Sequence, residues 1–99
     1  MNESNLPDIA KGKINLETSK ILWRELERFF ACGTAVFVAS PLSLVDVAYQ
    51  FSIDNKELVA QWMDNNQVAL VSDQQALQWL KLNTEVWAVV VKPWILVQE

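Results

Sequence analysis

The spacing of apolar residues predicts a first helix over residues 15–32. Asn15 is a suitable N-cap, and Gly33 is a suitable residue just past the helix end. The apolar face at helical spacing comprises Leu22, Leu26, Phe29 and Phe30. Residues 1–13 lack this periodicity and are mostly polar, so we predict a disordered tail over 1–13 and a single folded domain over 14–99.

Two further helices are predicted over residues 43–51 and 55–65, with only a short turn between them. Ser43 is the expected N-cap of the first, and Asp54 is the expected N-cap of the second. Their inward faces are predicted to hold Leu44, Val47, Ala48, Phe51, Leu58, Val59 and Trp62. Two helices joined in this way are typical of a helix-turn-helix.

Short β-branched and aromatic runs predict strands over 34–39, 68–71 and 86–91, and Trp94 to Val97 resumes an extended run after Pro93. Ser72 and Gln75 have the spacing of a capping box and predict a weaker fourth helix over residues 73–82. Its inward residues are expected to be Ala76, Leu77 and Leu80, with Trp79 at the margin.

This order of elements predicts an α+β domain with a winged-helix-like arrangement. It has three main helices, a small sheet and the weak fourth helix. The near-continuous apolar strands, and the helix before the last strands, also fit a small α/β sheet with parallel βαβ units. That second arrangement stays open as the alternative.

Charge and cysteine content limit the classes of partner. The chain has 99 residues, of which 12 are acidic and 8 basic, so its formal net charge is −4. An acidic balance disfavours nucleic acids and anionic membranes as partners. No apolar run approaches the roughly 18 residues of a membrane span. The one cysteine, Cys32, cannot form an intrachain disulfide, so we expect a cytoplasmic protein.

The residues needed for most catalytic and metal sites are missing. The chain has no histidine, the commonest general base and metal ligand. Cys32 is predicted to be a small buried residue, and the acids of the two middle helices are expected to be solvated. Two glycines cannot form a Gly-rich phosphate loop. We therefore predict no catalytic, cofactor or metal site and no enzyme; a small hydrolase or transferase is the third interpretation.

Five tryptophans are unusual in a chain of this length. Trp62 and Trp87 lie among apolar residues and are predicted to be in the core. Trp94 follows Pro93 in a segment that a regular central strand would not tolerate. We therefore expect an edge position there, where Trp94 and Ile95 contact a partner.

Sequence-specific DNA binding is the alternative function, and its contacts would come from Asn55, Lys56 and Gln61. Residues 43–66 contain four acids, namely Asp46, Asp54, Glu57 and Asp64, against the single base Lys56, so the local charge is −3. A DNA reader normally neutralises several phosphates with Lys or Arg. This charge favours a winged-helix-like scaffold that contacts protein instead.

Several segments resemble a known family. These are residues 15–30 (NLETSKILWRELERFF), Val47 and Ala48 with Asp54, Trp62, and the closing WAVVVKPWILVQ over residues 87–98. Together they resemble a family of small bacterial proteins known only as a domain of unknown function, over about residues 16–98. The resemblance implies a bacterial, cytoplasmic, single-domain protein and carries no catalytic residue.

The leading hypothesis is a non-enzymatic module that binds another protein or itself. Both faces of the predicted strand over 86–91 are apolar, with Val86, Ala88 and Val90 on one side and Trp87, Val89 and Val91 on the other. If the weak fourth helix leaves one face open, a second copy must cover it, because large exposed apolar patches are rare on monomers. We therefore expect a homodimer through the C-terminal strand region.

Overall fold

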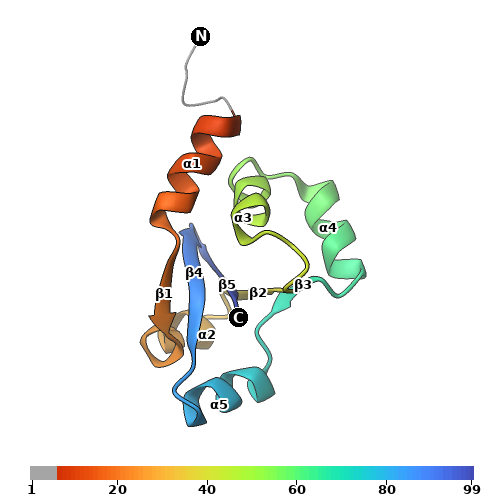
Figure 1. Cartoon of the computed structure of the whole chain (residues 1–99). Helices are drawn as coiled ribbons and strands as arrows, with labels where there is room; N and C mark the ends of the chain where they lie inside the picture. The colour runs from red at the N-terminus through yellow and green to blue at the C-terminus, as the bar shows by residue number, and fades with distance from the viewer. Residues whose placement is uncertain (1–6) are drawn as a thin grey trace.

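Five strands form one mixed sheet in the computed structural model, which describes residues 7–99 (Figure 1). The order across the sheet is β1-β4-β5-β2-β3. β5 pairs parallel with β2, and the other neighbours are antiparallel. The strands are β1 (Ser19–Leu22), β2 (Ala35–Val38), β3 (Val68–Leu70), β4 (Glu85–Val91) and β5 (Trp94–Gln98).

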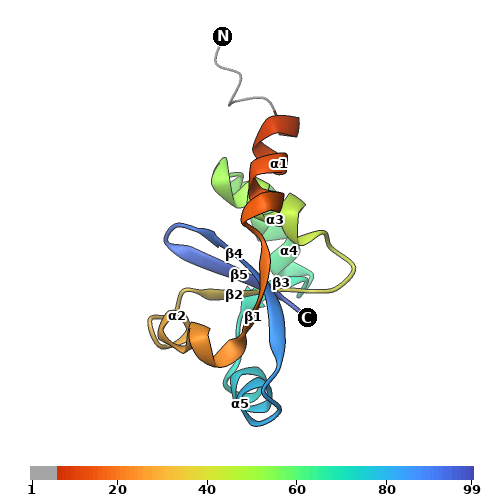
Figure 2. The same cartoon turned by 60° about the vertical axis from the view of Figure 1, so that its left-hand side comes forward.

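Helices lie on both faces of this sheet (Figure 2). On one side, α3 and α4 cover the sheet and α1 packs against α3. On the other side lie the 3-10 turn η2, α2 and α5. Their bounds are α1 (Pro7–Glu17), η2 (Trp23–Leu26), α2 (Glu27–Ala31), α3 (Leu44–Ser52), α4 (Lys56–Asp64) and α5 (Asp73–Lys81).

The core consists of two apolar clusters, one on each sheet face. The central strand β5 supplies both, because successive side chains of a strand point to opposite faces. Ile95 and Val97 lie in the first cluster and Leu96 in the second. The first cluster also contains Trp23, Leu26, Ala35, Val71, Ala76, Trp79, Val86 and Ala88; the second contains Val36, Val38, Leu44, Val47, Ala48, Val68 and Val89.

The structure confirms the α+β class and many local predictions. The Ser43 hydroxyl accepts from the Asp46 amide at the start of α3, and Ser72 and Gln75 form the predicted capping box of α5. Gly33 lies just past the end of α2 with φ of +73°. The winged-helix arrangement is not confirmed, since β3 and α5 separate α4 from the β4–β5 hairpin. One parallel pair, β2 with β5, joins an otherwise antiparallel sheet.

The prediction of one continuous helix over residues 15–32 is wrong, because β1 and the 3-10 turn η2 interrupt it. There α1 ends at Glu17, where the Thr18 hydroxyl donates to the carbonyl of Ile14. Residues 19–22 then form β1, in which Ser19 is in register with Ala88 and Leu22 with Glu85 of β4. Long-range pairing with β4 overrides the local helical spacing. Within residues 15–32, only 15–17 at the end of α1 and 27–31 in α2 are α-helical.

Residues 7–13, which we expected to belong to a disordered tail, lie in helix α1. This helix packs against α3, and Ile14 near its end contacts the second core cluster. Docking on the domain provides the apolar contact that the segment does not provide by itself. The rest of the predicted tail, residues 1–6, lies outside the described part of the chain.

One of the two core predictions for tryptophan, that for Trp87, also needs correction. Trp87 is 43% exposed, whereas Trp23 and Trp79, for which no core position was predicted, are 1% and 3% exposed. Trp62 is partly buried against the second cluster, which agrees better with its prediction. Trp87 lies near the end of the sheet beside the edge strand β1, where Lys20 covers its ring at 5.7 Å.

The predicted need for a second copy over the strand of residues 86–91 disappears in this fold. Val86 and Ala88 are buried in the first cluster and Val89 in the second. The weak fourth helix, α5, covers one face together with η2, and α3 covers the other. The chain therefore covers most of both faces itself and leaves Trp87 and Val90 as the exposed apolar residues of β4, at 43% and 48%.

Candidate functional site

A mainly apolar groove lies between α2 and α5, and we call it the α2–α5 groove. Its volume is about 360 Å³. Each helix contributes one face at helical spacing, as expected for residues three and four apart. The lining residues are Trp23, Glu27, Phe30 and Ala31 on one side and Asp73, Ala76, Leu77 and Leu80 on the other.

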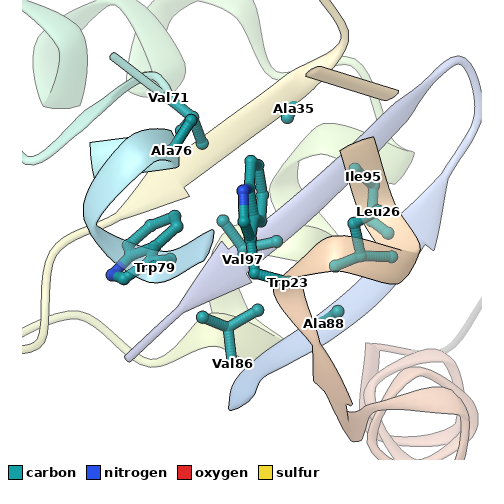
Figure 3. Packing of buried hydrophobic residues seen from close by; sticks show 10 residues of the cluster. All are labelled: Trp23, Leu26, Ala35, Val71, Ala76, Trp79, Val86, Ala88, Ile95 and Val97. Atoms are coloured by element: carbon teal, nitrogen blue, oxygen red, sulfur yellow. The ribbon is translucent and has the colours of Figure 1, made fainter. Parts of the chain in front are cut away.

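Two aromatic rings, Trp23 and Phe30, line this groove. Trp23 packs edge-on against Phe30 with ring centroids 6.0 Å apart, and against Trp79 at 5.1 Å. Figure 3 shows Trp23 at the centre of the first cluster, between side chains of α5 and of the central strands. The Trp79 indole Nε1 also donates to Glu99 Oε1 at 2.8 Å, which ties α5 to the end of the chain. The groove is therefore held by packing on both sides.

Leucines of α5 are exposed because its inward positions are taken by other residues. Ala76 and Trp79 are 8% and 3% exposed, whereas Leu77 is 58% and Leu80 44% exposed. Leu82, at the C-cap of α5, is 66% exposed. We call Leu77, Leu80 and Leu82 the α5 leucine surface. It extends from the α2–α5 groove to a second hollow of about 340 Å³ lined by Gln74, Leu77, Gln78, Lys81 and Leu82.

The charges of this surface are arranged along the helix. Asp73 lies in the first turn of α5 and Lys81 in its last turn. Both signs agree with the helix dipole, whose N-terminal end favours acids and whose C-terminal end favours bases. Leu77 and Leu80 thus lie between an acidic end and a basic end of the helix, and Leu82 follows Lys81.

Trp94 and Ile95 do not lie at an edge of the sheet, where we expected them to contact a partner. Pro93 lies in the turn of the β4–β5 hairpin, since Val91 is in register with Trp94. The proline therefore leaves the strand pairing intact, and β5 is the central strand of the sheet, so the predicted edge position was wrong. Ile95 is 1% exposed, and Trp94 packs against the second cluster. One side of Trp94 lines a hollow of about 170 Å³ with Phe51, Asp54, Asn55, Lys56, Val59 and Met63.

The predicted DNA contacts lie at the start of α4 and along it. Asn55, and not Asp54 as predicted, is the N-cap of α4: its Oδ1 accepts from the Leu58 amide, and its Nδ2 donates to Gln50 Oε1 at 2.8 Å. Both ends of the Asn55 amide are thus engaged within the protein. Lys56 pairs with Asp54 at 3.8 Å on the open surface, and Gln61 is exposed.

We expect Asn55→Ala to lower the free energy of unfolding by about 1 kcal/mol, because it removes the N-cap of α4. Asp54→Gly is the matched control. Asp54 has φ of +57°, a conformation that glycine adopts without strain, so this variant should keep or slightly raise stability. Urea unfolding followed by circular dichroism measures both. If Asp54→Gly lowers the free energy of unfolding more than Asn55→Ala does, Asp54 and not Asn55 is the N-cap of α4.

Cys32 is exposed in the structure, so its predicted buried position was wrong. It follows α2 at the C-cap, before Gly33 turns the chain toward β2. Among the residues the structure describes, no group of three or more Asp, Glu and Cys side chains is placed to hold a metal ion. Nor is any helix in this part of the chain long and apolar enough to cross a membrane.

The sequence contained a signal for the leucine surface that periodicity alone did not resolve. Ala76, Leu77 and Leu80 were predicted inward, and the capping box correctly set the helix start at Ser72. Ala76 and Trp79 also share a helix face, three residues apart. Trp79 has a larger apolar area than either leucine, so the helix face that carries Trp79 packs against the core. Leu77 and Leu80 then point outward.

Comparisons with known proteins give a family but no activity. A family model described as "Protein of unknown function (DUF2288)" matches residues 9–99, which confirms the resemblance to a family of unknown function. The NMR solution structure of PA1075 from Pseudomonas aeruginosa is similar, with 34% sequence identity and a TM-score of 0.80. The alignment covers 100% of this chain and 92% of that chain. No curated protein matches the chain.

Proposed function

We propose that this chain, which belongs to the DUF2288 family of proteins of unknown function, is a non-enzymatic protein-interaction module. The observation that carries the proposal is the α5 leucine surface beside the α2–α5 groove. Leu77, Leu80 and Leu82 are each more than two-fifths exposed, although helices cover the centre of both sheet faces. Contiguous apolar surface next to a hollow is typical of a site that binds protein.

The chemistry of the chain supports a binding role over catalysis. It contains no histidine, and among residues 12–99 no polar or charged side chain is fully buried. Catalytic groups are usually placed where burial and neighbouring charges tune them. The α2–α5 groove instead has mainly apolar lining, with Glu27 and Asp73 as its charged members. Apolar contact is what such a groove offers a ligand.

DNA binding by a winged-helix-like domain remains the alternative function. The paired helices α3 and α4 are present, but Lys56 lies beside Asp54 and the Asn55 amide is used within the protein. The sequence charge of residues 43–66 is −3. Because phosphate contacts supply most non-specific affinity for DNA, this surface favours the protein-binding proposal. We also propose a cytoplasmic location, since the free thiol of Cys32 is exposed and suits a reducing compartment.

Site-specific photo-crosslinking tests the proposed function. A benzophenone amino acid replaces Leu77 in one variant and Leu16 in another, and both are expressed in the native host. Leu16 is the matched control, because it is 86% exposed but lies on α1, on the other side of the sheet from α5. We expect light-dependent protein adducts at position 77 and none, or far fewer, at position 16. No adduct at 77, or equal yields at both positions, would overturn the proposal.

A further inference from the structure

We infer that the α5 leucine surface binds the same surface of a second copy of this chain, with the two α5 helices antiparallel across a two-fold axis. This inference rests on the proposed function, and it names the partner. Two-fold dimers are the commonest assemblies of identical chains, and in them one surface must complement itself. The pattern of residues on α5 meets that condition.

Leu77 lies midway between the two charged ends of the helix. Asp73, Leu77 and Lys81 follow each other at intervals of four residues, so they form one stripe along α5. If the two-fold axis passes near Leu77, Leu77 of one copy contacts Leu77 of the other. Leu80 and Leu82 extend the apolar contact on either side of this stripe.

The charges on this stripe fit an antiparallel pair and oppose a parallel one. With antiparallel helices, Asp73 of each copy faces Lys81 of the other, so two opposite-charge contacts form. With parallel helices, Asp73 faces Asp73 and Lys81 faces Lys81. The antiparallel arrangement also brings the N-terminal end of each helix dipole near the C-terminal end of the other. Charge complementarity of this kind sets orientation more than affinity.

The α2–α5 groove gives the leucines of a second copy a place to pack. Leu77 and Leu80 form one wall of it, and Phe30 and Ala31 form the other. In both views α5 lies at the lower end of the molecule, with no other element beneath it (Figures 1 and 2). A second copy can therefore approach α5 without displacing any part of the fold.

The contact is small, because α5 has nine residues. Interfaces at the small end of the size range are usually weak and transient. We expect a dissociation constant of roughly 1–100 μM. The protein then exchanges between monomer and dimer in solution.

Sedimentation velocity of the full chain tests the dimer over about 1–500 μM, a range that spans the expected dissociation constant. The weight-average mass should rise from 11.3 kDa toward twice that value. Leu77→Asp should remain at 11.3 kDa across the range, whereas Leu16→Asp, which changes an exposed leucine on α1, should dimerise like the natural chain. Far-UV circular dichroism confirms that each variant is folded. A natural chain that stays monomeric, or a Leu77→Asp variant that dimerises normally, overturns the inference.

Charge exchange tests the antiparallel arrangement separately. Asp73→Lys and Lys81→Asp should each weaken the homodimer by about tenfold or more, since each faces like charges across the axis. An equimolar mixture of these two variants should form a heterodimer, because every lysine then faces an aspartate. The double variant Asp73→Lys/Lys81→Asp should recover the homodimer. Single variants that dimerise normally, or a mixture that fails to assemble, would overturn the antiparallel contact.

The two proposals fail in different ways. If crosslinks at position 77 reach only a different protein and the purified chain stays monomeric, self-association is wrong and the interaction module stands. If position 77 gives no adducts and the chain stays monomeric, both are wrong. If the adducts at 77 join two copies of the chain and the charge exchange behaves as expected, both are supported.

Discussion

Trp23→Ala should destabilise the domain by about 3–5 kcal/mol, the usual range for removing a fully buried large aromatic side chain. Trp23 is 1% exposed, and its ring packs against both Phe30 and Trp79. Its removal opens a cavity between α5 and the sheet, because neighbouring side chains relax only in part. Small domains are stable by only about 5–15 kcal/mol, so much of the margin is lost. Urea unfolding followed by far-UV circular dichroism measures the effect.

Trp87→Ala is the control for Trp23→Ala, since it makes the same chemical change at a different site. Trp87 is 43% exposed, and the ammonium of Lys20 lies over its ring, 5.7 Å from the centroid. An exposed cation–π contact contributes about 0.5–1 kcal/mol. We therefore expect a much smaller loss in Trp87→Ala. If the two variants lose the same stability, Trp23 is not the central residue of the first cluster.

The second large effect is expected on the opposite face of the sheet. Leu96→Ala should reduce the free energy of unfolding by about 2–5 kcal/mol. Leu96 is fully buried in the central strand and lies in register with Val89 of β4 and Val36 of β2. These three side chains form one row across the second cluster. Shortening the middle member leaves a void between the sheet and the helices that cover it.

Leu70→Ala is the matched control for this row. Leu70 is in register with Val36 on the edge strand β3, but its side chain is 53% exposed. The same change should therefore lower stability by less than about 1 kcal/mol. Equal losses at positions 96 and 70 would mean that β3 is more deeply covered than the structure shows.

Local signals predicted much of the fold because their physics involves neighbouring residues only. The capping box of Ser72 and Gln75 and the N-cap at Ser43 lie within three residues of their partners, so the sequence alone identifies them. The strand around Val86 to Val91 was also evident from its run of β-branched residues. The predicted N-cap of α4 was wrong by one residue. The turn before α4 places Asp54 at positive φ, and Asn55 is the N-cap instead.

The candidate site was harder to predict, because it depends on which apolar side chains of α5 are buried in the core and which are left exposed. Leu77 and Trp79 are both suited to burial on a helix such as α5. Their actual positions depend on Trp23 and Phe37, which pack against Trp79 from distant parts of the chain. No spacing rule within residues 73–82 contains that information. The exposed leucines are thus a consequence of tertiary packing.

The sequence by itself determined the α+β class, the order of most strands and helices, the two serine caps and the absence of histidine chemistry. Each depends on composition or on residues close together in the chain. Only the tertiary structure decided that Ser19 to Leu22 form a strand, that β5 is central and that α5 turns its leucines outward. These outcomes rest on contacts between residues far apart in sequence, such as Ser19 with Ala88, whose energies override local propensity.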